Sequence, residues 1–142
     1  MWSLSGWMYG VGALYLVLAV LSNPPMMGYP LKAFGAVFEP GAQEVILDVG
    51  LFIGSVVAVL GVFLLRGAKE PHLNRELVKL VVWLELIAGV LLSVYLGIRG
   101  YAHPVALAIW ATMHAGIAFT GRQALSRFKR HLTVVRPIRR AS

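Results

Sequence analysis

The segment that decides the fold is Leu77–Ile98, with the sequence LVKLVVWLELIAGVLLSVYLGI. An α-helix needs about 20 predominantly apolar residues to cross a hydrocarbon core of about 30 Å. This segment meets that length, so it predicts a transmembrane helix. Three further stretches meet the same condition, at Leu4–Ser22, Val45–Leu65 and Pro104–Gly121. We therefore expect an all-α, antiparallel four-helix bundle that is integral to a membrane.

The composition of the whole chain agrees with this fold class. Hydrophobic residues make up 58% of the 142 residues and charged residues only 13%, which is far from the balance of a soluble domain. The formal net charge of +7 comes from basic residues between and after the apolar stretches, so we expect no nucleic-acid partner. The chain has no cysteine, which excludes disulfides, thiolate metal sites and iron–sulfur clusters.

The three connections between the apolar stretches differ in character. The first, 24–44, is apolar and rich in glycine and proline, so we expect it on the bilayer surface. It forms either a short interfacial helix at Leu31–Phe38 or an irregular loop over the helix ends. The second, Arg66–Glu76, is charged and is interrupted by a proline. The third, Arg99–His103, is so short that the last two helices must be antiparallel neighbours.

Lys and Arg residues predict the orientation, because short cytoplasmic loops carry the excess of them. Eleven lie around the second connection or after the fourth stretch, and only Lys32 and Arg99 lie on the other side. Both termini are therefore predicted to be cytoplasmic, in a multi-pass protein of the cell (plasma or inner) membrane. Residues 1–121 then form the membrane domain, and 122–142 form a basic tail that binds anionic lipid headgroups. The residues expected to bind headgroups are Arg127, Lys129, Arg130, Arg136, Arg139 and Arg140.

Small residues spaced four apart predict where helices pack, because they let helix backbones approach closely in lipid. Two of the predicted helices carry three such residues in register, and the first helix carries one pair, Gly6 and Gly10. The two longer series are Gly50, Gly54 and Ala58 in the second helix and Gly89, Ser93 and Gly97 in the third.

Ionisable side chains inside the spans are the candidates for function, since a charge in hydrocarbon is costly without a partner or a cavity. Glu85 and His114 lie at similar depth on antiparallel helices, and each shares a face with small residues, so we expect them to meet. Such a pair either titrates near physiological pH and binds a cation, a polar headgroup or a quinone carbonyl, or locks two helices together. Near the outer surface we expect Glu44, Asp48 and Arg99 to form a second polar cluster with a structural role.

Two classes of function fit these expectations. The sequence favours a small accessory or scaffold subunit that packs against membrane-protein partners through its glycine seams and apolar outer loop. The alternative is a small oligomeric carrier, channel or ligand-binding membrane protein that uses the Glu85/His114 site. A membrane enzyme is the least favoured class, and no catalytic residue or metal site is predicted. No cofactor is predicted either, because His114 is the only histidine deep in a span and a bis-histidine haem needs two.

Overall fold

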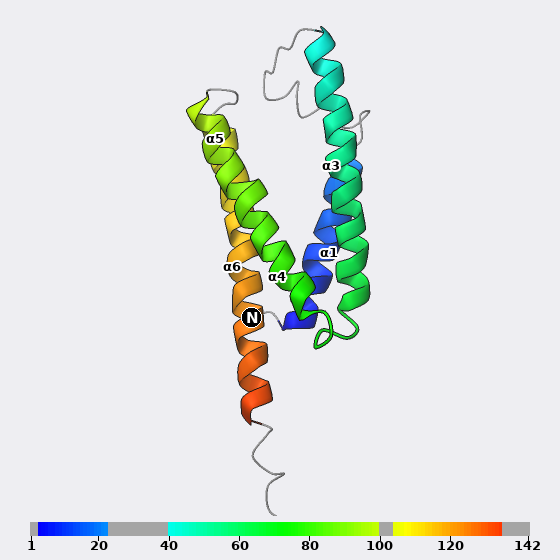
Figure 1. Cartoon of the computed structure of the whole chain (residues 1–142), viewed down its shortest axis with the longest axis vertical. Helices are drawn as coiled ribbons and strands as arrows, with labels where there is room; N and C mark the ends of the chain where they lie inside the picture. The colour runs from blue at the N-terminus through cyan, green and yellow to red at the C-terminus, as the bar shows by residue number, and fades with distance from the viewer. Residues whose placement is uncertain (1–2, 23–39, 100–103, 135–142) are drawn as a thin grey trace, which may run out of the picture. The chain divides into compact units, whose positions relative to one another are not determined.

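The computed structural model of the chain is all-α (Figure 1) and describes residues 3–22, 40–99 and 104–134. For 40–46 and 129–134 it describes the backbone alone. Within these residues, four helical stretches are long and apolar enough to cross a membrane. They are Leu4–Leu21, Leu47–Gly67, Arg75–Ile98 and Pro104–Phe128. The predicted fold class, an all-α membrane protein with four spanning helices, is confirmed.

The third span contains an irregular helical turn. In chain order, the described helices are α1 (Leu4–Leu21), α3 (Pro40–Gly67), α4 (Arg75–Leu84), the π-helix η1 (Glu85–Leu91), α5 (Leu92–Ile98) and α6 (Pro104–Val134). α4, η1 and α5 follow one another without a break and together form this span (Figure 1). The chain divides into two compact units, one of residues 9–66 and the other of residues 1–8 with 67–142.

In the first unit, α1 and α3 pack backbone against backbone. A Cβ atom placed on Gly12 would lie 3.0 Å from the carbonyl oxygen of Gly61, and one on Gly61 would lie 2.9 Å from the carbonyl oxygen of Gly12. Further along, a Cβ atom on Gly54 would lie 2.9 Å from Cβ of Ser22. Gly12 of α1 meets Gly61 of α3, whereas the later Ser22 meets the earlier Gly54, so the two helices are antiparallel. Small residues permit this close approach in lipid.

The second unit pairs α6 with α4, η1 and α5. The ring of His114 lies against Gly89, and a Cβ atom on Gly121 would lie 2.8 Å from Cγ2 of Val82. Residue numbers rise along one helix as they fall along the other, so these helices are also antiparallel. The short connection between α5 and α6 predicts this arrangement.

The first turn of α1 belongs to the second unit. Trp7 is 2% exposed, and its Nε1–H donates a hydrogen bond of 3.0 Å to Oγ1 of Thr120 on α6. The Ser5 hydroxyl donates a hydrogen bond of 2.7 Å to the carbonyl oxygen of Ala68, just after α3. The first residues of the chain therefore tie α6 to the turn that precedes α4.

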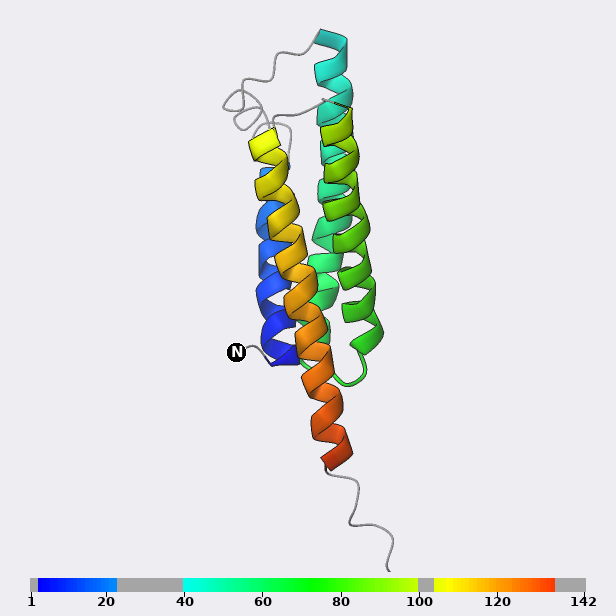
Figure 2. The same ribbon diagram turned by 90° about the vertical axis from the view of Figure 1, so that its left-hand side faces the viewer.

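Two helices are longer than the apolar stretches predict. α3 begins at Pro40, which agrees with the suitability of proline for the first turn of a helix. α6 continues past Gly121 to Val134 as one helix (Figure 2). Hydropathy falls after Gly121, but 122–134 contains neither glycine nor proline to end the helix. The basic tail therefore begins as a helix, while the proposed interfacial helix at Leu31–Phe38 lies outside the described residues.

Candidate intramembrane polar site

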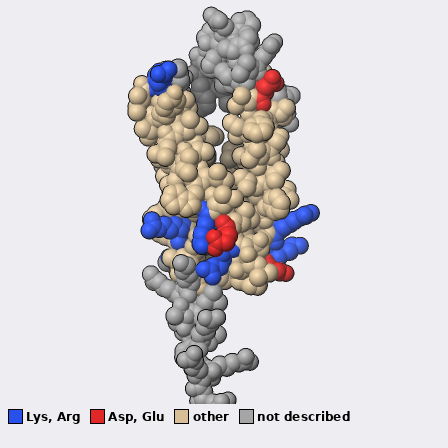
Figure 3. All heavy atoms as spheres, viewed as in Figure 1, with Lys and Arg blue, Asp and Glu red and all other residues tan. Residues whose placement is uncertain are grey.

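Charged side chains mark the depth of the site within the second unit. Lys and Arg gather near the start of α4 and in the part of α6 that follows Gly121. A largely uncharged stretch, made of α5 and the earlier part of α6, extends away from them (Figure 3). Lys79 and Arg99 are separated by about 30 Å at 1.5 Å per residue, which matches the thickness of a hydrocarbon core. Glu85 lies about 9 Å beyond Lys79 on the same scale, so its carboxyl group is inside the apolar layer.

The π-helix η1 begins at Glu85, which places the acidic residue at a change of helical geometry. At its end the Leu92 N–H donates to the carbonyl oxygen of Ile87, five residues back, so the turn is wider than in an α-helix. Glu85 and Gly89 are buried in this turn. Single π turns inside α-helices are found frequently at functional sites.

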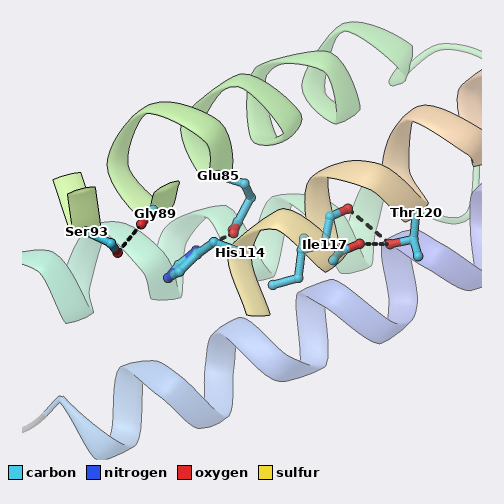
Figure 4. A network of polar contacts seen from close by, with 7 residues as sticks. Glu85, Gly89, Ser93, His114, Ile117 and Thr120 are labelled. Carbon is cyan, nitrogen blue, oxygen red and sulfur yellow. Dashed lines mark hydrogen bonds and ion pairs between the residues drawn. The ribbon is translucent and has the colours of Figure 1, made fainter. Parts of the chain in front are cut away.

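Glu85 and His114 form a hydrogen-bonded pair between η1 and α6 (Figure 4). Nδ1 of His114 contacts Oε2 of Glu85, and the two side chains are 14% and 3% exposed. The indole ring of Trp110 packs against the imidazole, with ring centroids 4.7 Å apart and planes tilted by 58°. The structure thus brings together the two ionisable side chains that the sequence places at similar depth.

Gly89 makes room for this pair. The imidazole of His114 occupies the space that a side chain at position 89 would fill. The Ser93 hydroxyl donates a hydrogen bond to the carbonyl oxygen of Gly89 one turn away (Figure 4). Two members of the predicted seam on the third span therefore lie beside the site. The third, Gly97, is exposed, and a Cβ atom on it would make only an ordinary contact, 3.5 Å from Leu107.

One polar atom of the pair has no partner among the described residues. Nε2 of His114 is buried and makes no hydrogen bond. A buried polar group without a partner costs about 1–3 kcal/mol. Joining two helices requires only the contact between Nδ1 and Glu85. Nε2 of His114 therefore remains able to form a hydrogen bond with another group.

A second polar contact lies two turns further along α6. The Thr120 hydroxyl shares its hydrogen between the carbonyl oxygens of Gly116 and Ile117, at 2.8 and 3.1 Å (Figure 4). Its oxygen also accepts the hydrogen bond from Nε1–H of Trp7. This contact ties the first turn of α1 to the helix that carries His114. The sequence does not predict this contact, because neither Trp7 nor Thr120 is ionisable and their separation along the chain gives no periodic signal.

The seam predicted in α3 coincides only in part with the α1–α3 contact. Gly54 lies at the contact, Gly50 is buried, and Ala58 is half-buried. The closest approach is at Gly12 and Gly61, which were not predicted. Gly54 and Gly61 are seven residues apart, so they share a helix face although they do not follow the four-residue spacing of the predicted seam.

The described residues do not test the remaining predicted site residues. Asp48 is exposed in one unit and Arg99 is exposed in the other, while the side chain of Glu44 lies outside the described residues, so the outer cluster stays a prediction. Of the predicted headgroup ligands only Arg127, half-buried on α6, has a described side chain. Within the described part of the chain, no three His, Asp or Glu side chains lie close enough to share a metal ion.

Comparison with known protein families identifies the family of this chain. No curated protein and no solved structure matches the chain. The BphX-like family matches residues 1–130, a range that contains the four spanning helices and both members of the buried pair. The chain is therefore a small multi-pass membrane protein, and it belongs to the BphX-like family.

Proposed function

We propose that this protein binds a proton, and with it a polar group of a ligand, at the Glu85–His114 pair inside the membrane. The observation that carries the proposal is the burial of the hydrogen-bonded side chains of Glu85 and His114 at the start of a π-helix. Ionisable residues inside a membrane are costly, and they commonly mark proton relays or ligand sites. Among ordinary side chains, only histidine titrates between about pH 5 and 8 without perturbation.

A purely structural role explains less of the geometry. A lock between two helices would be complete once Nδ1 of His114 met Glu85, yet Nε2 is enclosed without a partner among the described residues. A lock also gives no reason for the wide turn of η1 directly opposite the imidazole. A site that binds a proton or a ligand accounts for both the buried Nε2 without a partner and the wide turn of η1.

The test is a pH titration of the His114 ring in the whole protein. Protein with ¹⁵N-labelled histidine in lipid nanodiscs is followed by NMR from pH 5 to 8, and a His114→Gln variant identifies the His114 signals. We expect these signals to titrate, and Glu85→Gln to alter the titration while leaving the melting temperature nearly unchanged. Thr112→Val, an exposed position on α6 whose hydroxyl bonds only within its own helix, serves as the matched control.

A structural lock gives the opposite pattern. In that case the His114 signals stay constant over the whole pH range. Glu85→Gln is mild because its amide keeps the hydrogen bond, whereas His114→Gln lowers the melting temperature well below that of Thr112→Val. This result would reject the proposed proton site.

An accessory-subunit role is a second candidate, supported by an unoccupied face of α6. Ala115 and Gly116 are exposed, and a Cβ atom on Gly116 would meet nothing within 4 Å. Exposed small residues are where another transmembrane helix can approach closely. A partner that co-purifies in mild detergent should be lost from Gly116→Leu and retained by Ile109→Leu, a change at another exposed position of the same helix. Equal recovery with both variants, or no partner at all, would count against this role.

A further inference from the structure

We propose that the ligand of this site is a neutral, lipid-soluble molecule that presents a carbonyl oxygen to the Nε2–H group of His114. The inference rests on the proposed function and adds the chemistry of the ligand. It is carried by one atom, the buried Nε2, which has no hydrogen-bond partner among the described residues.

The proton count of the pair decides that Nε2 is a donor. A net-neutral pair is either a carboxylate with an imidazolium or a carboxylic acid that donates to Nδ1 of a neutral imidazole. In both arrangements Nε2 carries a hydrogen. Only a carboxylate with a neutral imidazole protonated on Nδ1 would leave Nε2 as an acceptor, and that arrangement gives the pair a net negative charge inside the apolar layer. Because such a charge is costly there, the neutral arrangements are favoured.

A buried donor is stabilised by a hydrogen-bond acceptor, and the depth of the site in the membrane indicates which class of ligand can supply that acceptor. Glu85 lies about 9 Å along the helix beyond Lys79, and His114 lies about 12 Å before Arg122, so both are inside the apolar layer. A ligand that reaches this depth must dissolve in hydrocarbon, and the pair is already neutral. An uncharged molecule with a carbonyl oxygen satisfies Nε2–H without adding charge.

The element beside the imidazole is suited to admit such a ligand. Nε2 is enclosed by protein atoms, so a ligand reaches it only after a local movement. The ring lies against Gly89, at the centre of η1, where the hydrogen bonding departs from that of an α-helix. A local change of hydrogen bonding in this turn is therefore the movement by which we propose that the ligand gains access to the ring.

The experiment measures the carbonyl stretching band of a ketone in the membrane. The full-length protein is placed in nanodiscs of diether phospholipid, which has no ester carbonyl, and is titrated with undecan-2-one labelled with ¹³C at the carbonyl. We expect a saturable component at lower wavenumber than in empty discs, because hydrogen bonding weakens the C=O bond. The ¹⁵N signal of His114 Nε2 should shift with the same saturation. Undecane, which has no acceptor, should produce neither change.

Variants connect the band to the named atom. The double change Glu85→Leu with His114→Phe should abolish the saturable component, and it should still fold, because replacing a buried ionic pair by apolar side chains is often neutral. Circular dichroism and the melting temperature check its folding. Gly116→Ala, on the same helix with open space around it, should bind the ketone like the unchanged protein.

Different outcomes show whether the carbonyl belongs to a lipid ester or to a separate molecule, and which results overturn the inference. If the component appears in diether discs but not in diester discs, the natural occupant is a lipid ester; if it appears in both, it is a separate molecule. No saturable component in the unchanged protein, or one that persists in the double variant, overturns the inference. The proposed proton site is tested independently, because the ring can titrate without binding the ketone and can bind the ketone without titrating.

Discussion

At the residue scale, the absence of a side chain at Gly89 is what permits the buried pair. A methyl group there would overlap the imidazole of His114. We expect Gly89→Ala to push the ring away from Glu85 and to lower the stability by about 1–3 kcal/mol, the usual cost of overpacking. Thermal unfolding in detergent measures the loss, and the ¹⁵N signals of His114 report the displaced ring.

Two glycines of the same unit provide the controls for that change. A Cβ atom would meet only Leu107, at 3.5 Å, when placed on Gly97 and nothing within 4 Å when placed on Gly116. Alanine also favours a helix more than glycine does. Gly97→Ala and Gly116→Ala should therefore be neutral or slightly stabilising. If Gly89→Ala behaved like these two variants, the tight packing at the ring would be wrong.

The sequence could predict that Glu85 and His114 meet, because depth along antiparallel helices follows from counting residues from a short connection. It could not predict which atoms of the imidazole would be used. That depends on the rotation of both helices and on the side chain of Trp110, whose packing against the ring has no signature in spacing. The contact of Trp7 with Thr120 could not be predicted for a similar reason, since it joins residues 113 positions apart in the sequence.

At the scale of the helices, the α1–α3 contact depends on two glycines that face each other. A Cβ atom on Gly61 would lie 2.9 Å from the carbonyl oxygen of Gly12, which belongs to the backbone and cannot move aside easily. We expect Gly61→Ala to destabilise the protein by about 1–3 kcal/mol in detergent unfolding. Gly10→Ala, at an exposed position of α1, should leave stability unchanged or raise it slightly. Equal effects of the two changes would exclude close backbone packing at Gly61.

The four spans were predictable because their lengths follow from the thickness of the hydrocarbon core. The wide turn of η1 was not, because the sequence from Glu85 to Leu91 is as apolar and as helix-compatible as its neighbours. The extension of α6 to Val134 was missed for a different reason. A fall in hydropathy indicates where a helix leaves the lipid, but the helix itself continues until a residue such as glycine or proline ends it. Residues 122–134 contain neither glycine nor proline, so α6 continues through them.

At the scale of the whole molecule, the distribution of basic residues predicts the orientation in the membrane. We expect a reporter fused after Ser142 to remain in the cytoplasm and a tag inserted near Gly28 to be reached from outside. Both points lie outside the described residues, so the prediction rests on the excess of Lys and Arg on one side. Protease protection of the two tags in intact cells and in opened vesicles decides the matter. Detection of both tags on one side would reject the four-span topology.

The basic tail is expected to bind anionic lipid by charge. A peptide of residues 122–142 should bind vesicles of phosphatidylglycerol at about 1 kcal/mol per basic residue near the surface. Binding should weaken steeply between 50 and about 500 mM salt, because screening shortens the reach of each charge. A peptide with its Lys and Arg residues changed to Gln is the matched control. Equal binding to neutral vesicles would show that the tail recognises something other than charge.

The continuity of α6 has a mechanical consequence. It is one helix of 31 residues, and it carries both His114 and Arg127. With about 1.5 Å per residue it is about 45 Å long, and its unbroken backbone hydrogen bonds make it resist torsion. Any turn of the helix about its own axis at His114 therefore rotates Arg127 through nearly the same angle. A rotation that starts at the buried pair is therefore transmitted along α6, without an interruption of the helix, to the basic residues near its C-terminal end.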